Sequence, residues 1–137
     1  MLLFKEKFKN WFLLRSDKRD FKEFIQGITE DMIEGSKKSI YYGCPLTTLA
    51  QELANSHEDI ANYYYESLKK VIDLFSYILE KSGIKKDQCD IMARQVFSMY
   101  EGYLVYFRIS KDSNVLTNMK NDLITFYEKI ILNEVVI

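Results

Sequence analysis

Residues 91 to 109 are the stretch that most constrains how this chain can fold. Two apolar stripes run along it, each following the alternating four- and three-residue step that keeps side chains on one side of a helix. A surface helix ordinarily shows one apolar stripe, so two neighbouring stripes predict a helix covered over more than half its circumference. Either the rest of the chain or a second subunit must provide that cover. The first stripe consists of Met92, Val96, Met99, Tyr103 and Tyr106, and the second of Ala93, Phe97, Tyr100, Leu104 and Phe107.

The composition is that of one helical domain of 137 residues, with 47% hydrophobic and 28% charged residues. One proline and five glycines are few helix breakers for this length, so long helices are expected and no segment is predicted as a strand. Helical periodicity and end signals predict an all-α fold of about six helices. They cover residues 2–14, 17–34 with Gly35 as the end, 45–54, 56–82 with Ser56 as the cap and Gly83 as the end, 87–109, and 113–133.

The last of these helices also carries two apolar stripes. Two consecutive helices of this kind have more apolar surface than the remaining helices can cover, which favours self-association over a buried monomer core. We therefore predict a two-fold homodimer in which the last two helices of each subunit form a four-helix bundle. A central core helix within a monomer is the alternative. The predicted interface consists of Met92, Val96, Met99, Tyr103, Tyr106, Leu116, Met119, Leu123, Phe126 and Ile130.

Charge and motif content argue against several classes of function. Nineteen basic and twenty acidic residues give a net charge of −1 with no concentrated basic face, so the chain is not expected to hold DNA by itself. A single histidine, His57, and the widely separated Cys44 and Cys89 supply no metal motif. We predict no enzyme activity, no metal and no cofactor. Without a secretory signal or an apolar run of bilayer length, the protein is expected to be cytoplasmic, without membrane contact.

Three charged residues, Arg94, Glu101 and Arg108, interrupt the apolar stretch at seven-residue intervals. A glutamate near arginines is usually a structural pair, although one of the three could instead face a cavity and orient a ligand. Gly102, next to Glu101, is interpreted as a position where another helix packs closely.

Two segments resemble a known family. Residues 43–54, Gly-Cys-Pro-Leu-Thr-Thr-Leu-Ala-Gln-Glu-Leu-Ala, and residues 101–112, Glu-Gly-Tyr-Leu-Val-Tyr-Phe-Arg-Ile-Ser-Lys-Asp, are similar to two elements of the C-terminal domain of TetR/AcrR-type transcriptional regulators. In that family the first element begins a short helix and the second ends the first dimerisation helix. Their order and separation match, so the resemblance covers residues 1–137 as a single domain. It implies an effector cavity within the upstream helices and a dimer bundle made by the last two.

Regulators of this family begin with a DNA-reading helix-turn-helix, which we do not find in this sequence. Residues 1–15 correspond instead to the helix that connects that module to the effector domain, so DNA contact is expected only through a missing N-terminal domain. The resemblance implies a repressor in which an effector shifts the connecting helix and, with it, the DNA-reading heads of the homodimer. The alternative is a stand-alone dimerisation module that acts through protein pairing without binding DNA.

The predicted effector cavity is formed by inward-facing side chains of the helices that surround it. Their apolar and aromatic character is the reason for expecting a small apolar or aromatic effector. They are Phe24, Ile28, Met32, Leu49, Leu53, Tyr64, Leu68, Phe97 and Tyr100.

Overall fold

The computed structural model describes residues 2–39 and 55–132 of the chain, with side chains from residue 9 onward. These residues form α-helices and no strand, which confirms the all-α prediction. The short helix expected at residues 45–54 lies outside the described residues. The helices are α1 (Leu2–Ser16), α2 (Phe21–Lys37), α4 (Glu58–Lys81), α5 (Lys86–Ser110) and α6 (Ser113–Ile131).

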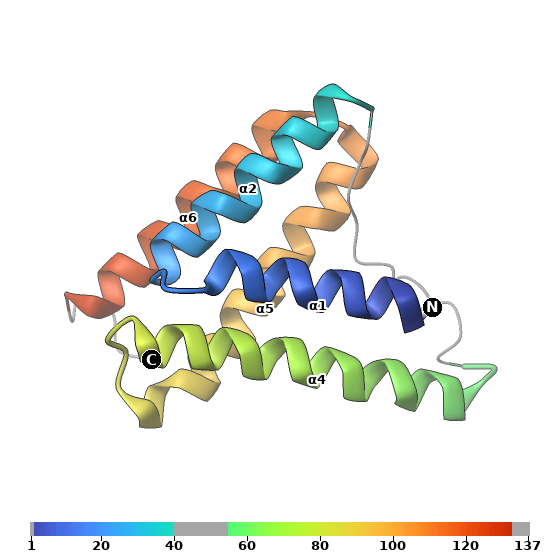
Figure 1. Ribbon diagram of the computed structural model, residues 1–137, viewed down its shortest axis with the longest axis horizontal. Coiled ribbons are helices and arrows are strands. Elements are labelled where there is room, and N and C mark those ends of the chain that lie inside the picture. Colours follow the sequence, from blue (N-terminus) through green and yellow to red (C-terminus); the bar gives the residue numbers. More distant parts are fainter. Residues whose placement is uncertain (1, 40–54, 133–137) are drawn as a thin grey trace.

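Each helix packs mainly on one or two neighbours around a shared core. Helix α4 packs against α5, α5 against α6, α6 against α2, and α2 against α1. In Figure 1, α5 begins below the left end of α4 and rises to the right, and α6 then returns beside α2 along the same diagonal. The two helices predicted to dimerise are therefore neighbours within one subunit, as a bundle requires.

The core faces of α5 and α6 differ in part from the sequence-based prediction. Of the second predicted stripe, Ala93, Tyr100, Leu104 and Phe107 are buried. The first stripe divides: Met92 and Val96 are buried, Met99 and Tyr103 are partly buried, and Tyr106 is exposed. This stripe divides because it lies at the edge of the face that α5 turns toward the core.

Helix α2 begins and ends later than its periodicity predicted. Asp20 supplies the cap, because its carboxylate accepts a hydrogen bond of 2.9 Å from the Glu23 amide, and the Glu23 side chain accepts one of 3.4 Å from the Asp20 amide. This reciprocal arrangement is a capping box, and it fixes Phe21 as the first helical residue. Gly35 does not end the helix; it is buried within it, and the helix continues to Lys37.

The prediction that Ser56 caps α4 is wrong. The helix begins at Glu58 after His57, which makes no side-chain cap, and the Ser56 hydroxyl lies 2.9 Å from Nδ1 of the exposed His57 ring. Negative charge from Glu58 and Asp59 still faces the positive end of the helix dipole. At the other end, Gly83 has a φ of +102°, the left-handed backbone that suits glycine after a helix, as predicted.

Candidate effector and dimerisation sites

Four aromatic rings from four different helices meet in the interior. Phe12 of α1 lies with its ring centre 5.4 Å from that of Phe24 in α2, 5.8 Å from Phe75 in α4 and 6.2 Å from Tyr100 in α5. Phe75 is in turn 5.9 Å from Phe24 and 5.8 Å from Tyr100. All four rings are at most 1% exposed, so they form one closed contact group, called the aromatic cluster below.

The predicted cavity residues are only partly brought together. Those on α2, namely Phe24, Ile28 and Met32, share the core with Tyr100 of α5. Tyr64 is buried near the start of α4, against the Tyr63 ring and outside that core, and Leu68 and Phe97 are partly buried. Leu49 and Leu53 lie outside the described residues. Phe12 and Phe75, which the predicted cavity did not include, complete the cluster. Each lies on the apolar face of its helix, and that position in the sequence could have indicated them.

A polar clasp holds α1 to α2 beside this cluster. The Asp31 carboxylate accepts hydrogen bonds from Arg15 through both its oxygens, with Arg15 Nε 2.6 Å from Oδ2, and Trp11 Nε1 donates to the same Oδ2 at 2.8 Å. Burial raises the pKa of Asp31, but the hydrogen bonds from Arg15 and Trp11 outweigh burial and hold that pKa below its ordinary value. The clasp therefore favours the ionised carboxylate.

Most of the predicted dimer-interface side chains belong to the subunit core. The packing of α4 on α5 and of α2 on α6 covers them, so they present no outer surface to a second copy. The residues covered in this way are Met92, Val96, Leu116, Met119, Leu123 and Ile130. Met99, Tyr103 and Phe126 are partly buried and Tyr106 is exposed, so these four remain candidates for an interface.

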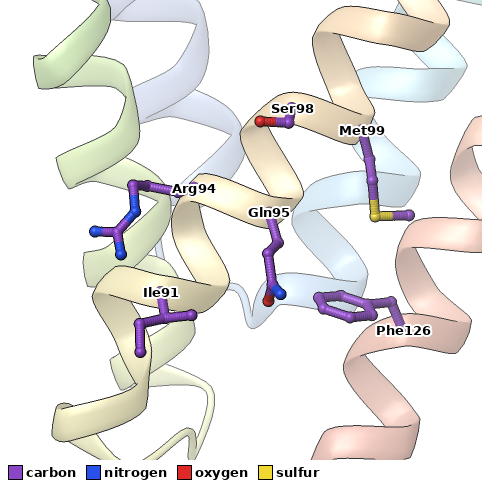
Figure 2. A pocket seen from close by; sticks show the side chains of 6 residues that line it. All are labelled: Ile91, Arg94, Gln95, Ser98, Met99 and Phe126. Carbon is purple, nitrogen blue, oxygen red and sulfur yellow. The ribbon is translucent and has the colours of Figure 1, made fainter. Parts of the chain in front are cut away.

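An open hollow of about 480 Å³ lies on the outer side of α5, where α6 borders it. Figure 2 shows Gln95 of α5 and Phe126 of α6 pointing toward one another, with Met99 above them, while Arg94 points the other way. Ile91 and Ser98 complete the lining. The hollow thus combines apolar walls with hydrogen-bonding groups, and two of its lining residues, Met99 and Phe126, belong to the predicted dimer interface.

Two further residues on this side of α5 bear on that assignment. The Tyr103 hydroxyl donates a hydrogen bond to Asp122 of α6, which commits Tyr103 to a contact within the subunit and raises its pKa. A Cβ added at Gly102 would meet no described atom within 4 Å. The close helix packing expected at Gly102 is therefore not made inside the described part of the subunit.

Other chemistry is sparse within residues 2–39 and 55–132. In these ranges no three His, Cys, Asp or Glu side chains gather where they could hold a metal ion. None of the helices there is both long and apolar enough to cross a membrane. Cys89 is buried, and burial, followed by the nearby Glu80 carboxylate, raises the pKa of its thiol.

The described residues thus form an all-helical domain with an aromatic interior and a mixed outer face on its last helices, an architecture typical of helical regulatory domains. Residues 19–122 match the family model for the C-terminal domain of LmrA/YxaF-like transcriptional regulators. The chain therefore belongs to this family of TetR-type C-terminal domains, whose members are transcription regulators and not a class of enzymes.

A similar protein supports the same assignment. Over 115 residues the chain is 28% identical to a protein of Lactococcus lactis subsp. lactis described as an "uncharacterized HTH-type transcriptional regulator in lacX 3'region". The match covers 81% of this chain and 56% of that relative, so the chain spans little more than half of the relative's length. A comparison with solved structures gave no match.

Proposed function

We propose that this chain is the effector-sensing and homodimerisation domain of a TetR-family transcriptional repressor that acts in the cytoplasm. The proposed effector sensing rests on the position of Phe12, because this residue of α1 supplies one of the four rings of the aromatic cluster. A ligand that enters between Phe24 and Tyr100 would meet Phe12 and Phe75, the two rings that contact both of them. A displacement of Phe12 would move α1.

The effector that fits this interior is a small apolar or aromatic compound. The aromatic cluster and its neighbours Ile28 and Met32 offer ring faces and aliphatic surface, with a single hydroxyl at Tyr100. A charged ligand would lose hydration among these apolar groups. Because the rings are in contact, the effector would select a more open arrangement that is populated at a low level.

The consequence for regulation follows from the position of α1. In the longer regulators of this family, a helix at this place joins the effector domain to the DNA-reading module. An effector that binds better to one placement of α1 than to another shifts the population of placements by its difference in affinity. Two such domains in a dimer would then change the separation of their DNA-reading heads.

A thermal-shift screen tests the sensing proposal. The chain is heated with a panel of small aromatic and aliphatic compounds, and bound compounds raise the midpoint because they bind only the folded state. A hit should lose its shift in Tyr100→Leu, which changes the cluster, and keep it in Tyr77→Leu, which alters an exposed tyrosine of α4. Equal shifts in both variants, or no shift with any compound, would contradict binding in the cluster.

The dimerisation half of the proposal uses the outer side of α5. Tyr106 and Ile109 are 59% and 78% exposed, which is a large apolar area for one end of one helix. The open hollow lies toward the other end of the same helix, around Gln95. Gly102 lies between the two, with free space in front of its backbone.

The exposed apolar residues at one end of α5 and the hollow at its other end could pair between two copies of the chain. A two-fold axis passing close to Gly102 would run the α5 helices of two copies antiparallel and place residues before Gly102 opposite residues after it. Tyr106 and Ile109 of one copy would then fill the hollow near Gln95 of the other, and the missing Cβ at Gly102 would let the two helices approach closely. Phe126 and Met99 would form the wall of the hollow.

Cross-linking distinguishes this register from other dimers. Two single variants, Gln95→Cys and Ile109→Cys, are made with Cys44 replaced by Ser. Mixed together and oxidised, they should give a disulfide-linked dimer, whereas each alone should not, since position 95 lies opposite position 109. Sedimentation at micromolar concentration should return twice the chain mass. A single-chain mass would contradict the dimer, and links within one variant would contradict only the register.

A further inference from the structure

Three segments that are distant in sequence meet at Ser82, the C-cap residue that follows α4. The Ser82 hydroxyl accepts a hydrogen bond of 2.7 Å from the backbone amide of Phe21, the first residue of α2. The same hydroxyl donates to the Ile78 carbonyl at 2.6 Å. The hydroxyl therefore accepts one hydrogen bond and donates another, and it fixes the start of α2 to the end of α4.

The third segment is the C-terminal half of α6. The Tyr127 hydroxyl donates a hydrogen bond of 2.8 Å to the Ser82 carbonyl, and the Tyr127 ring lies 5.1 Å from the Phe21 ring. Phe21 is fully buried and Tyr127 is 9% exposed, so these contacts are partly buried. Gly83 extends the contact, since a Cβ there would lie 3.7 Å from Ile131 of α6.

The end of α1 is tied to the same place. Lys81, next to Ser82, donates from Nζ to the carbonyl of Ser16, the last residue of α1, at 2.7 Å. Arg19 donates to the Leu14 carbonyl at 3.0 Å. Cations at these carbonyls satisfy backbone groups that a helix end leaves open and complement the negative end of its dipole.

We propose that Ser82 is a joint that transmits the position of α6 to the α1–α2 turn, so that a displacement of α6 reaches α1 without passing through the aromatic cluster. The inference rests on the proposed function, in which α6 belongs to the dimer interface and α1 carries the movement to the DNA-reading module. The joint gives the dimer and the effector separate routes to the same helix.

Hydrogen exchange of the full chain tests the joint through three variants. Tyr127→Phe removes only the hydroxyl on Ser82, and Ser82→Ala removes the hydroxyl on Phe21. Ser76→Ala is the matched control, because it removes a serine hydroxyl of α4 that bonds Asp90 of α5 at 3.0 Å and not the turn. Exchange is followed at the amides of Asp17 and Phe21 in the turn.

The joint predicts that Tyr127→Phe speeds exchange at Asp17 and Phe21 about five-fold, the size expected for loss of one hydrogen bond. Ser82→Ala should do at least the same at Phe21, whereas Ser76→Ala should leave both amides unchanged. Unchanged turn amides in Tyr127→Phe, or equal acceleration of these amides in Ser76→Ala, would overturn the joint. Sedimentation of the same samples reports the dimer separately, so a monomeric chain would defeat the dimer proposal alone.

Discussion

Arg15 of α1 and Asp31 of α2 form a two-point ion pair, in which Nε and Nη2 of the guanidinium each bond one carboxylate oxygen. Paired, nearly parallel hydrogen bonds of this kind fix orientation as well as distance. Trp11 adds a third donor to the same carboxylate one turn earlier in α1. The pairing therefore sets how α1 lies across α2, which is the geometry that the proposed sensing mechanism would change.

Replacing Asp31 by asparagine should weaken this clasp. Asp31→Asn keeps the shape but loses the charge and one of the acceptor oxygens, and both partners are about 30% exposed, so solvent screening reduces the effect. We expect a loss of about 1 kcal/mol in the free energy of unfolding, measured by urea denaturation. The matched control is Glu34→Gln, whose pair with Lys37 is more exposed and should contribute almost nothing. Equal effects of the two variants would contradict a special contribution from the clasp.

The clasp should also make stability depend on pH in a defined direction. The pKa of Asp31 is lowered in the folded chain, so the folded state binds this proton less readily than the unfolded state does. Its contribution is then present above the unfolded pKa and is lost as the pH falls through the lower, folded pKa. The difference in unfolding free energy between the native chain and Asp31→Asn should shrink as the pH is lowered from about 7 to about 2. A difference that grew on acidification would contradict the assigned direction.

Periodicity was sufficient to predict the described helices and much of the core but not the outer face. It placed Phe24 and Tyr100 inside because each lies on the apolar face of its helix. It assigned Met92 and Val96 to the dimer interface, because periodicity alone does not show which neighbour covers α5. Burial settles that these two are core residues. The exposed apolar residues near Gly102 became visible only once the covered side was known.

Polar contacts between distant segments were beyond sequence reasoning for a different reason. Ser82 and Phe21 are 61 positions apart, and a serine after a helix usually reads as a local cap. The hydrogen bond between them exists because α4 and α2 happen to end and begin at one place. The same holds for Arg15 and Asp31. Their charges alone did not predict that they pair, because the pairing depends on how α1 lies against α2.

Replacing Thr29 by valine should stabilise the chain. Thr29 of α2 is fully buried, and its hydroxyl oxygen has no hydrogen-bond partner among the described residues. A buried hydroxyl without a partner carries a desolvation cost of about 1–3 kcal/mol, which an apolar group of the same shape avoids. We expect Thr29→Val to raise the thermal midpoint, whereas Thr125→Val, at an exposed position of α6, should leave it unchanged. A lower midpoint for Thr29→Val would show that the hydroxyl is in fact satisfied.

Replacing Gly102 by alanine should have opposite effects on the subunit and on the dimer. Alanine favours a helix over glycine by about 1 kcal/mol, and the added methyl would meet nothing within the described subunit. At concentrations where the chain is monomeric, Gly102→Ala should therefore be more stable. If a second copy approaches closely at Gly102, the same methyl should raise the dimer dissociation constant, measured by sedimentation. A stabilised subunit with unchanged dimerisation would move the interface away from this residue.

Phe12→Ala is the most direct test of the link between α1 and the interior. It removes one ring from a cluster in which Phe12 contacts three others, and a truncation of this kind typically costs about 3–5 kcal/mol. Since that is a large share of the stability of one domain, Phe12→Leu provides a milder variant, and Leu14→Ala, at a position 67% exposed, is the control on the same helix. The cavity left by Phe12→Ala should bind small aromatic compounds, and bound compound should restore part of the lost thermal midpoint. The contrary outcome is a destabilised Phe12→Ala whose thermal midpoint no aromatic compound restores, with Phe12→Leu still folded. Phe12 would then be a packing residue, and the effector would have to bind elsewhere.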